Sequence, residues 1–420
     1  MRHLIYLATR SAWNRRLTLG VTLAAIALSV TLLLGVERIR NDARASFAQA
    51  VSGTDLIVGP RTGPVQLMLY MVYRIGEATN SISWKSFEFI AASPAVAWAV
   101  PMSLGDSHHG FAVMGTTQNY FDHFRHGDST PLAFATGARF EKLFDAVIGA
   151  DVARRLGYKA GDKITLSHGS GEINHAEHDD KPFIVTGILA PTGTPVDRTV
   201  HVSLEALQAL HLEWQAGIPI PGLNIPPELV TKFDLRPKAV TGALVGMKAR
   251  GEVFRLQRQI NNYKEEPLLA VLPGVALDQL WDVIGFAEKS LLAVSAMVVV
   301  VGLAGLVAVM LAGINERRRE LAILRSVGAR PIDIFALLTM EGVCVTLAGA
   351  LLGVALLALL GATLGSTLQS HYGLVLQTAI LSIEELPLLG AVIGAGALVS
   401  LVPGYRAYKV SLADGLIPAD

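Results

Sequence analysis

The sequence predicts an α-helical membrane protein with four transmembrane helices and a large α+β domain inserted between helices 1 and 2. Three observations predict this class. The 420 residues are 51% hydrophobic but only 17% charged, whereas soluble domains carry about 25% charged residues. Four apolar segments are long enough to cross a bilayer, which takes about 20 residues. Residues 37–289, between the first two apolar segments, are mixed in composition and long enough for a domain outside the membrane.

The charge balance and the cysteine count exclude some classes of protein. Lysine plus arginine number 35, as do aspartate plus glutamate, so no excess of positive charge indicates a nucleic-acid partner. Cys344 is the only cysteine, which excludes an intramolecular disulfide framework and a cysteine-based zinc cluster. Since Cys344 lies in the third apolar segment, we expect a small buried residue without a redox role.

Hydropathy and flanking charge divide the chain into nine segments. The first apolar segment is too long for the core of a signal peptide, and no small-residue cleavage pattern follows it, so we interpret it as a retained span. The predicted segments are an N-terminus at 1–16, span 1 at 17–36, an external stalk and core domain at 37–289, span 2 at 290–314, a loop helix at 315–335, span 3 at 336–365, a short external loop at 366–385, span 4 at 386–405 and a tail at 406–420.

The arginine and lysine residues next to the spans predict the orientation. They gather in the N-terminus, in the loop 315–335 and in the tail 406–420. Short loops rich in these residues stay in the cytoplasm. The large domain and the loop 366–385 are therefore expected on the outside.

The external region reads as a domain between two helical stalks. Residues 37–51 extend span 1 outward, and residues 276–288 have apolar side chains at three- and four-residue spacing before span 2. Strands are expected at 54–58, 95–100, 164–166 and 183–189, and short helices at 148–156 and 204–210. The mixture predicts an α+β domain.

The pattern of residues 315–335 predicts a short amphipathic helix, in which Leu321, Ile323 and Leu324 are apolar. Gly328 ends it, and Pro331 begins the next helix. One interpretation is a positively charged anchor on the lipid surface. The Glu-Arg-Arg-Arg-Glu run and the Gly-Ala-Arg-Pro break favour another, a rigid helix on which a soluble partner docks.

This segment resembles the cytoplasmic coupling helix of the MacB/LolE/FtsX family of ABC transporter permeases. The shared pattern is Glu-Arg-x-x-Glu, then apolar residues, then Gly-Ala and a return into the membrane. Residues 52–76, 147–166, 183–207 and 403–416 resemble other parts of the family in the same order. The resemblance implies a periplasmic core domain and location in a bacterial inner membrane. It also implies that nine residues couple the chain to an ATPase. They are Glu316, Arg317, Arg319, Glu320, Leu321, Leu324, Arg325, Gly328 and Ala329.

The resemblance further implies a permease dimer that binds cytoplasmic ABC ATPases and passes their motion to the periplasm, a mode called mechanotransmission. The chain has no G-x-x-x-x-G-K-[ST] sequence, so ATP and magnesium are expected in a separate ATPase subunit and this chain is not expected to be an enzyme. No catalytic residue is assigned. The cargo is left open among a lipoprotein, a peptide or drug and a metal-linked substrate, and a periplasmic or lipid-anchored binding protein is a further expected partner.

Two alternatives remain beside transport. An FtsX-like scaffold would transmit the state of the ATPase to a periplasmic envelope enzyme. A membrane-anchored enzyme is disfavoured, because the external domain has neither a G-x-S-x-G elbow nor an H-E-x-x-H helix.

The spans carry no charge at mid-depth, which argues against an ion pathway. Glu341, near the cytoplasmic end of span 3, is expected to face the coupling helix. Small residues recur at spacings that allow close helix approach, either within one subunit or at a dimer seam. They are Gly302, Gly305, Gly349, Gly353, Gly390, Gly394 and Gly396.

Nine of the eleven histidines lie between positions 108 and 211. Together with acidic neighbours they offer ligands for zinc or a similar divalent ion. The alternative is that 167–181 is a solvated hairpin tip without such a role. The candidate ligands are His168, His175, Glu177, His178, Asp179, His108 and His109. Equal zinc affinity in the wild type and in a His168/His175/His178→Ala variant would contradict the metal site.

Overall fold

The computed structural model describes residues 16–76, 80–168, 180–215, 218–219, 225–316, 318–372 and 380–409. The chain forms two compact units. The helical unit comprises Met1–Ala43, Gly285–Gln369 and Val375–Asp420, and the sheet unit comprises Arg44–Ile284 and Ser370–Leu374.

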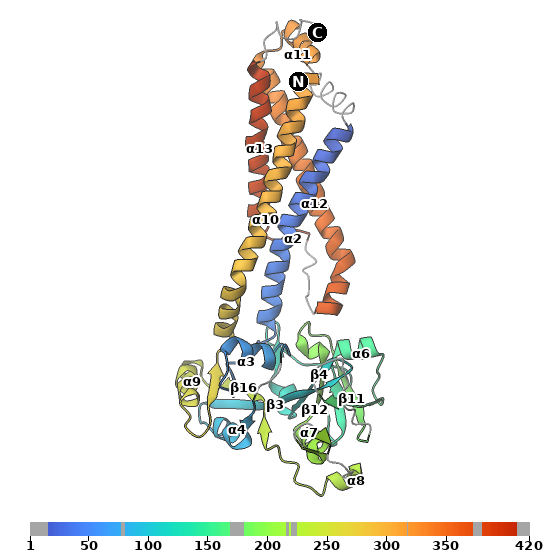
Figure 1. Ribbon diagram of the computed structural model, residues 1–420, viewed down its shortest axis with the longest axis vertical. Coiled ribbons are helices and arrows are strands. Elements are labelled where there is room, and N and C mark those ends of the chain that lie inside the picture. The colour runs from blue at the N-terminus through green and yellow to red at the C-terminus, as the bar shows by residue number, and fades with distance from the viewer. Residues whose placement is uncertain are drawn as a thin grey trace. The chain divides into compact units, whose positions relative to one another are not determined.

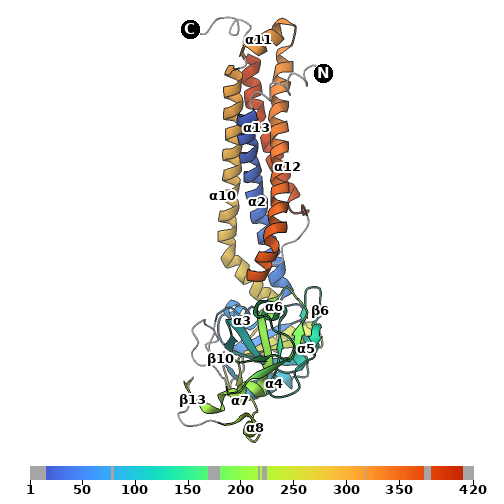
Figure 2. The same cartoon turned by 90° about the vertical axis from the view of Figure 1, so that its right-hand side faces the viewer.

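The helical unit is built from four long helices and one short one (Figures 1 and 2). The long helices are α2 (Arg16–Gln49), α10 (Pro273–Glu316), α12 (Pro331–Tyr372) and α13 (Leu386–Lys409), and the short one is α11 (Arg318–Ser326). Within the described residues, each long helix is apolar and long enough to cross a membrane. The four predicted spans therefore lie in four helices, with the large domain between the first and the second.

The core of the helical unit follows helical spacing. Ile26, Val30 and Leu34 of α2 recur every four residues and are buried against Leu303 and Leu306 of α10. The outward faces of the same helices carry exposed aliphatic side chains, as expected where lipid replaces water. Packing among helices in such an environment depends on close approach rather than on exclusion of water.

Glycines of α12 provide that close approach to α2. A Cβ atom at Gly349 would lie 2.7 Å from Cγ2 of Ile26, and one at Gly353 would lie 2.7 Å from the carbonyl oxygen of Ala27. Gly302 and Gly396 are also in contact inside the unit. These four glycines therefore serve packing within one subunit.

The remaining glycines of the predicted small-residue pattern have open space beside them. At Gly305, Gly390 and Gly394, an added Cβ would meet no described atom within 4 Å. A dimer seam remains a prediction for these three. The expected burial of Cys344 is wrong, since its side chain is exposed in the part of the chain that the structure describes.

The sheet unit is organised around an eleven-stranded mixed sheet. Nine strands follow the order β17-β1-β16-β3-β4-β12-β8-β11-β7, with β10 paired to β3 and β9 paired to β11. Only the pairs β4–β12 and β8–β11 are parallel among the described strands. The bounds are β1 Leu56–Pro60, β3 Val96–His108, β4 Phe111–Thr116, β7 Phe134–Gly137, β8 Asp145–Ile148, β9 Lys163–Ile164, β10 Ser167–His168, β11 Phe183–Leu189, β12 Thr199–Ser203, β16 Gly242–Met247 and β17 Leu268–Val271.

Short elements complete the sheet unit. Three two-stranded pairs are β2 (Ile82–Ser83) with β15 (Ala239–Val240), β5 (Arg125–His126) with β6 (Thr130–Pro131), and β13 (Trp214–Gln215) with β14 (Ile218–Pro219). The helices are α3 Pro64–Met71, α4 Trp84–Ala91, α5 Asn119–His123, α6 Ala150–Leu156, α7 Leu204–Leu210, α8 Pro227–Val230 and α9 Val253–Asn261, with 3-10 turns η1 Pro195–Arg198, η2 His211–Glu213 and η3 Arg250–Glu252.

Both faces of the large sheet are covered. Successive residues of a strand point to opposite faces, and β1 shows the consequence, because Ile57 packs with α3 and α5 whereas Leu56 and Val58 pack with α4 and α9. All five residues of β1 are buried. Such strands read as continuous apolar runs rather than as alternating ones.

Candidate functional site

The short helix α11 joins α10 to α12 at one end of the helical unit, the end where α2 begins and α13 finishes (Figures 1 and 2). Its inward face holds Leu321 and Ala322, which are buried, and Leu324, which is half-buried. Leu321 and Leu324 pack with Ile314 of α10 and Ile334 of α12. Leu321 and Leu324, two of the predicted coupling residues, therefore lie on the face of α11 that packs within the helical unit.

The outward face of α11 is mixed in character. Glu316 and Glu320 are exposed, as are Ile323 (56%) and Val327 (83%). Glu320 and Ile323 are three residues apart on α11 and share one side of that helix, whereas Glu316 is the last residue of α10 and Val327 lies in the turn after α11. Of the three apolar residues that the amphipathic pattern singles out, Ile323 is the exposed one. A surface that combines two carboxylates with two exposed aliphatic side chains suits a protein partner.

The remaining predicted coupling positions are placed as follows. Arg319 lies in α11, and Arg325 is half-buried on the same helix. Arg317 lies outside the described residues. Gly328 and Ala329 form the turn after the helix, where Gly328 is exposed and Ala329 half-buried.

That turn is fixed by backbone hydrogen bonds. The N–H of Gly328 donates to Arg325 O (3.1 Å) and the N–H of Ala329 donates to Leu324 O (3.0 Å). Gly328 has φ +104°, a conformation that favours glycine. On the other side, the N–H of Arg330 donates to Oδ2 of Asp333 (2.9 Å), which closes the first turn of α12. The two helices therefore meet at a defined angle.

Replacing Gly328 with alanine is expected to strain this turn by about 1–2 kcal/mol, because an L side chain is disfavoured at positive φ. We expect the affinity for an ATPase docked on α11 to fall up to about tenfold. Quantitative co-purification of the ATPase checks this. Gly361→Ala is the matched control, since Gly361 is helical and an added Cβ there meets no described atom. An equal loss in both variants would contradict the role of the turn.

Glu341 of α12 lies close to α11, as predicted. It lines a small pocket together with Leu321 and Leu338, and with Met310 and Ile314 of α10. The pocket is mostly apolar. The carboxyl group of Glu341 therefore lies beside the packed face of α11.

A buried ion pair in the helical unit was missed from the sequence. Arg38 of α2 donates through Nε and Nη2 to both carboxylate oxygens of Glu385, each at 2.7 Å. Nη2 also donates to Ile380 O (3.1 Å). Arg38 is 8% exposed and Glu385 0%. Both residues flank apolar segments in the sequence, but they are 347 residues apart, so no local pattern pairs them.

The described histidines of the external region have structural partners. His108 is buried, with Nδ1 2.6 Å from Thr165 O and Nε2 3.1 Å from the hydroxyl oxygen of Tyr158. Burial lowers the pKa of His108. His109 is exposed beside it with φ +46°. Of the other candidate ligands, His168 lies in β10, where it pairs with Asp106 of β3, and His175, Glu177, His178 and Asp179 lie outside the described residues. No group of three or more His, Cys, Asp or Glu able to hold a metal occurs among the described side chains.

His211 forms an ion pair that depends on its protonation. It follows α7, and its Nε2 lies 3.7 Å from Oδ1 of the buried Asp106 of β3. Burial lowers the pKa of His211, but the hydrogen bond and the charge of Asp106 outweigh this effect and raise the pKa above its ordinary value. The pair links the helix α7 to the sheet.

The sheet unit is therefore expected to gain stability from this pair at low pH. The gain is complete below the ordinary histidine pKa of about 6.5 and is lost as pH rises through the raised pKa. Asp106→Asn should lower the unfolding midpoint, followed by tryptophan fluorescence, most below pH ~6.5 and least at alkaline pH. A difference between wild type and variant that stays constant with pH would contradict this assignment.

Two family models match the chain. The one described as the MacB-like periplasmic core domain matches residues 19–225. The one described as the FtsX-like permease C-terminal region matches residues 292–412. The second match contains α11 and the last two long helices.

Curated relatives match most of the chain. The macrolide export ATP-binding/permease protein MacB of Nitrobacter winogradskyi is 25% identical over 412 residues, which are 94% of this chain and 57% of that protein. The lipoprotein-releasing system transmembrane protein LolC of Neisseria meningitidis serogroup B is 21% identical over 426 residues, covering 94% of this chain and 93% of LolC. The chain thus spans little more than half of that MacB protein and nearly all of LolC.

Two solved structures are similar to the chain over about half its length. The extracellular domain of the ABC-type transporter YknZ from Gram-positive bacteria matches with 12% identity and a TM-score of 0.29, covering 52% of this chain and 98% of that one. The periplasmic region of MacB from Actinobacillus actinomycetemcomitans matches with 7% identity and a TM-score of 0.33, covering 56% and 97%.

Proposed function

Because the chain belongs to the MacB/LolE/FtsX family of ABC transporter permeases, we propose that it is the permease subunit of a complex whose ATPase is a separate polypeptide. The observation that carries this proposal is the geometry of α11. One face of the helix is packed against the ends of two long apolar helices, and the other presents Glu320 and Ile323 to the outside, with the exposed Val327 in the turn that follows. We infer that the ATPase docks on this outward face.

The long helices supply a route for motion. α10 runs without interruption over 44 residues, about 66 Å at 1.5 Å per residue. It contributes Ala276, Leu277 and Leu280 to the core of the sheet unit and Leu303 and Leu306 to the core of the helical unit. Movement of α11 by the ATPase would displace the attached end of α10. We propose that this displacement is the signal passed to the sheet unit.

The remaining parts of the proposal follow from the same premise. The helical unit would lie in a bacterial inner membrane with α11 in the cytoplasm and the sheet unit in the periplasm. The α11 end of the helical unit holds Arg16 of α2, three arginines of α11, and Arg406 and Lys409 of α13, which supports this orientation. A second copy of the chain would complete the complex. The names of the relatives suggest two cargo classes, a lipoprotein or a macrolide-like drug.

The test is purification of the tagged chain from its native membrane in mild detergent, followed by mass spectrometry of the proteins retained. We expect a soluble ABC ATPase, and a periplasmic or lipid-anchored protein that identifies the cargo. A retained periplasmic hydrolase together with the ATPase would favour the FtsX-like scaffold instead. Recovery of the chain as a dimer without any ATPase would overturn the permease function.

A further inference from the structure

The helices α2 and α10 meet inside the sheet unit at a small group of aromatic rings. Phe47, in the last turn of α2, lies 5.5 Å from Trp281 of α10 between ring centroids, with the ring planes at 72°. Arg44 of α2 lies over the ring of Trp281, its guanidinium carbon 5.2 Å from the centroid. An edge-to-face ring pair and a cation–π contact both depend on orientation as well as on distance. All three residues belong to the sheet unit.

The end of α3 joins this group through Tyr73. The ring centroids of Phe47 and Tyr73 lie 4.4 Å apart, and the hydroxyl of Tyr73 donates to the carbonyl oxygen of Phe47 (2.6 Å). Tyr73 is buried, and burial raises the pKa of its hydroxyl above the usual value. The phenol therefore keeps its proton for this hydrogen bond, which ties the last turn of α2 to the end of α3.

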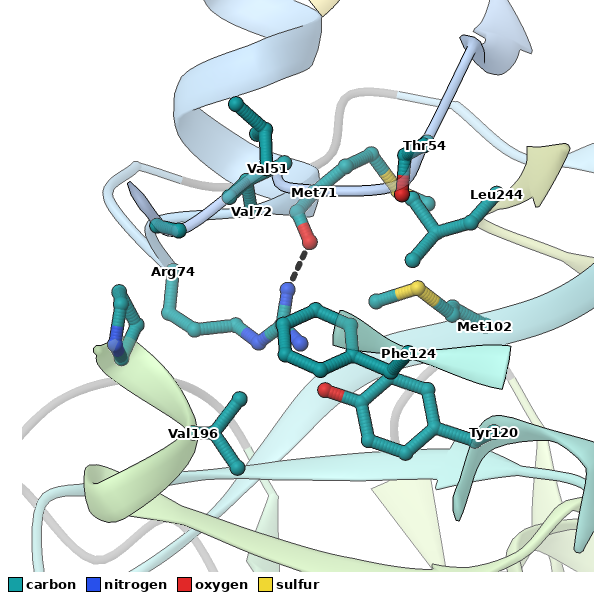
Figure 3. A pocket seen from close by; sticks show the side chains of 12 residues that line it. Val51, Thr54, Met71, Val72, Arg74, Met102, Tyr120, Phe124, Val196 and Leu244 are labelled. Carbon is teal, nitrogen blue, oxygen red and sulfur yellow. Dashed lines mark hydrogen bonds between the residues drawn. The ribbon is translucent and has the colours of Figure 1, made fainter. Parts of the chain in front are cut away.

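The same two chain segments also pack closely a few residues further on. Val51, two residues past α2, and Val72, the residue after α3, line one small cavity (Figure 3). The cavity has room for about one water molecule, so little free space separates the two segments. Close-packed groups pass a displacement on instead of absorbing it. A shift of the end of α2 therefore reaches α3.

The helix α3 in turn packs on the large sheet. Leu67 of α3 and Ile57 of β1 belong to one buried cluster, against which Phe47 and Trp281 also pack. A Cβ atom at Gly59 of β1 would lie 2.5 Å from Cδ1 of Leu67, so helix and strand approach closely. The group that connects the two long helices with α3 is called the aromatic joint below, and it consists of Arg44, Phe47, Tyr73 and Trp281.

Trp281 differs from the other side chains that α10 contributes to this cluster. Ala276, Leu277 and Leu280 make aliphatic contacts, which have no preferred angle. The contacts of Trp281 with Phe47 and Arg44 are oriented ones. A movement of α10 therefore changes the surroundings of the Trp281 ring more than it changes those of its aliphatic neighbours.

We propose that Trp281 is the positioning residue through which displacement of α10 enters the sheet unit, and that the aromatic joint passes it to α2 and α3. The inference rests on the proposed function and gives the transfer of motion a defined place. Movement of α10 carries the Trp281 ring against Phe47 and beneath Arg44. Since Phe47 is bonded to Tyr73, the end of α3 follows.

The test uses Trp281 as its own reporter. The other four tryptophans, at 13, 84, 98 and 214, are replaced with phenylalanine, and the chain is purified in detergent together with its ATPase. Trapping the ATPase with ATP and vanadate is expected to shift the emission maximum of Trp281, because the ring moves relative to Arg44 and Phe47. The same chain without the ATPase should show no shift on addition of ATP and vanadate.

A chain that keeps Trp84 as its one tryptophan is the matched control. Trp84 lies in α4 and packs against a different buried cluster. Its emission should not respond to trapping. A response at Trp84 as large as that at Trp281 would overturn the inference, because the sheet unit would then sense the nucleotide without the tryptophan of the aromatic joint.

Two variants of the Trp281-only chain separate transfer of motion from stability. Phe47→Leu removes the ring between Trp281 and Tyr73 and should abolish the shift, whereas Phe47→Tyr keeps a ring there and should retain it. Both variants should bind the ATPase as the parent chain does. A contact that served stability alone would alter the unfolding midpoint in Phe47→Leu and leave the nucleotide-dependent shift in place.

The outcomes distinguish this inference from the proposed function. If no ATPase co-purifies with the chain, the proposed function fails and the inference fails with it. If the ATPase binds and is trapped but the emission of Trp281 does not change, the inference alone is overturned. A shift that persists in Phe47→Leu overturns it as well.

Discussion

Replacing Ile323 with aspartate is expected to weaken binding of the ATPase about 30-fold or more. Ile323 is 56% exposed at the centre of the outward face of α11, beside Glu320 and Val327. A central aliphatic contact in an interface contributes about 2 kcal/mol or more, which is about a 30-fold change in affinity. A carboxylate there would be desolvated without a partner on docking. The measurement is the dissociation constant of the detergent-purified chain and its ATPase.

Phe254→Asp is the matched control for this variant. Phe254 is 66% exposed on α9 of the sheet unit, so the substitution also replaces an exposed apolar side chain with a charge. We expect ATPase affinity to remain at the wild-type value. Unchanged affinity in Ile323→Asp, or an equal loss in the control, would remove the outward face of α11 from the docking site.

Removing the carboxylate of Glu385 is expected to lower the free energy of unfolding of the helical unit by about 3–5 kcal/mol. Glu385→Ala leaves the guanidinium of Arg38 buried without its two charge-assisted hydrogen bonds. The pair joins α2 to the segment that precedes α13, although the two residues are far apart in sequence. The measurement is unfolding of the purified chain, followed by loss of helical circular dichroism.

Two further variants separate the buried pair from a general effect of charge. Glu384→Ala removes an exposed neighbour whose contact is a hydrogen bond from Asn41, and its cost should stay within about 1 kcal/mol. The double variant Arg38→Met/Glu385→Leu should recover most of the lost stability, since apolar residues of similar volume replace a buried pair at little cost. A double variant as unstable as Glu385→Ala would show that the charge pair is not the cause.

The sequence predicted the architecture because the dominant signals are local. Each span is a continuous apolar run, and the four runs appear as four long helices. In the sheet unit, α7 and β11 have the predicted bounds. These elements carry strong helical or alternating patterns, and a pattern of this kind depends on near neighbours only.

Features that depend on distant parts of the chain were not predicted. β3 extends to His108, well past the expected end at 100, because its far half pairs with β4 and β10. The partner of Arg38 is 347 residues away. Hydrophobicity alone does not say which apolar side chains of a short helix face the core, and in α11 Ile323 is exposed.

The most direct test of the proposed coupling places a photoreactive amino acid at Val327, whose side chain is 83% exposed in the turn after α11. The same probe at Phe254 serves as the reference. Illumination of native membranes is predicted to link position 327, and not position 254, to a soluble ABC ATPase identified by mass spectrometry. If the ATPase binds the chain but links to neither position, or to 254 alone, α11 is not the coupling element and the account is contradicted.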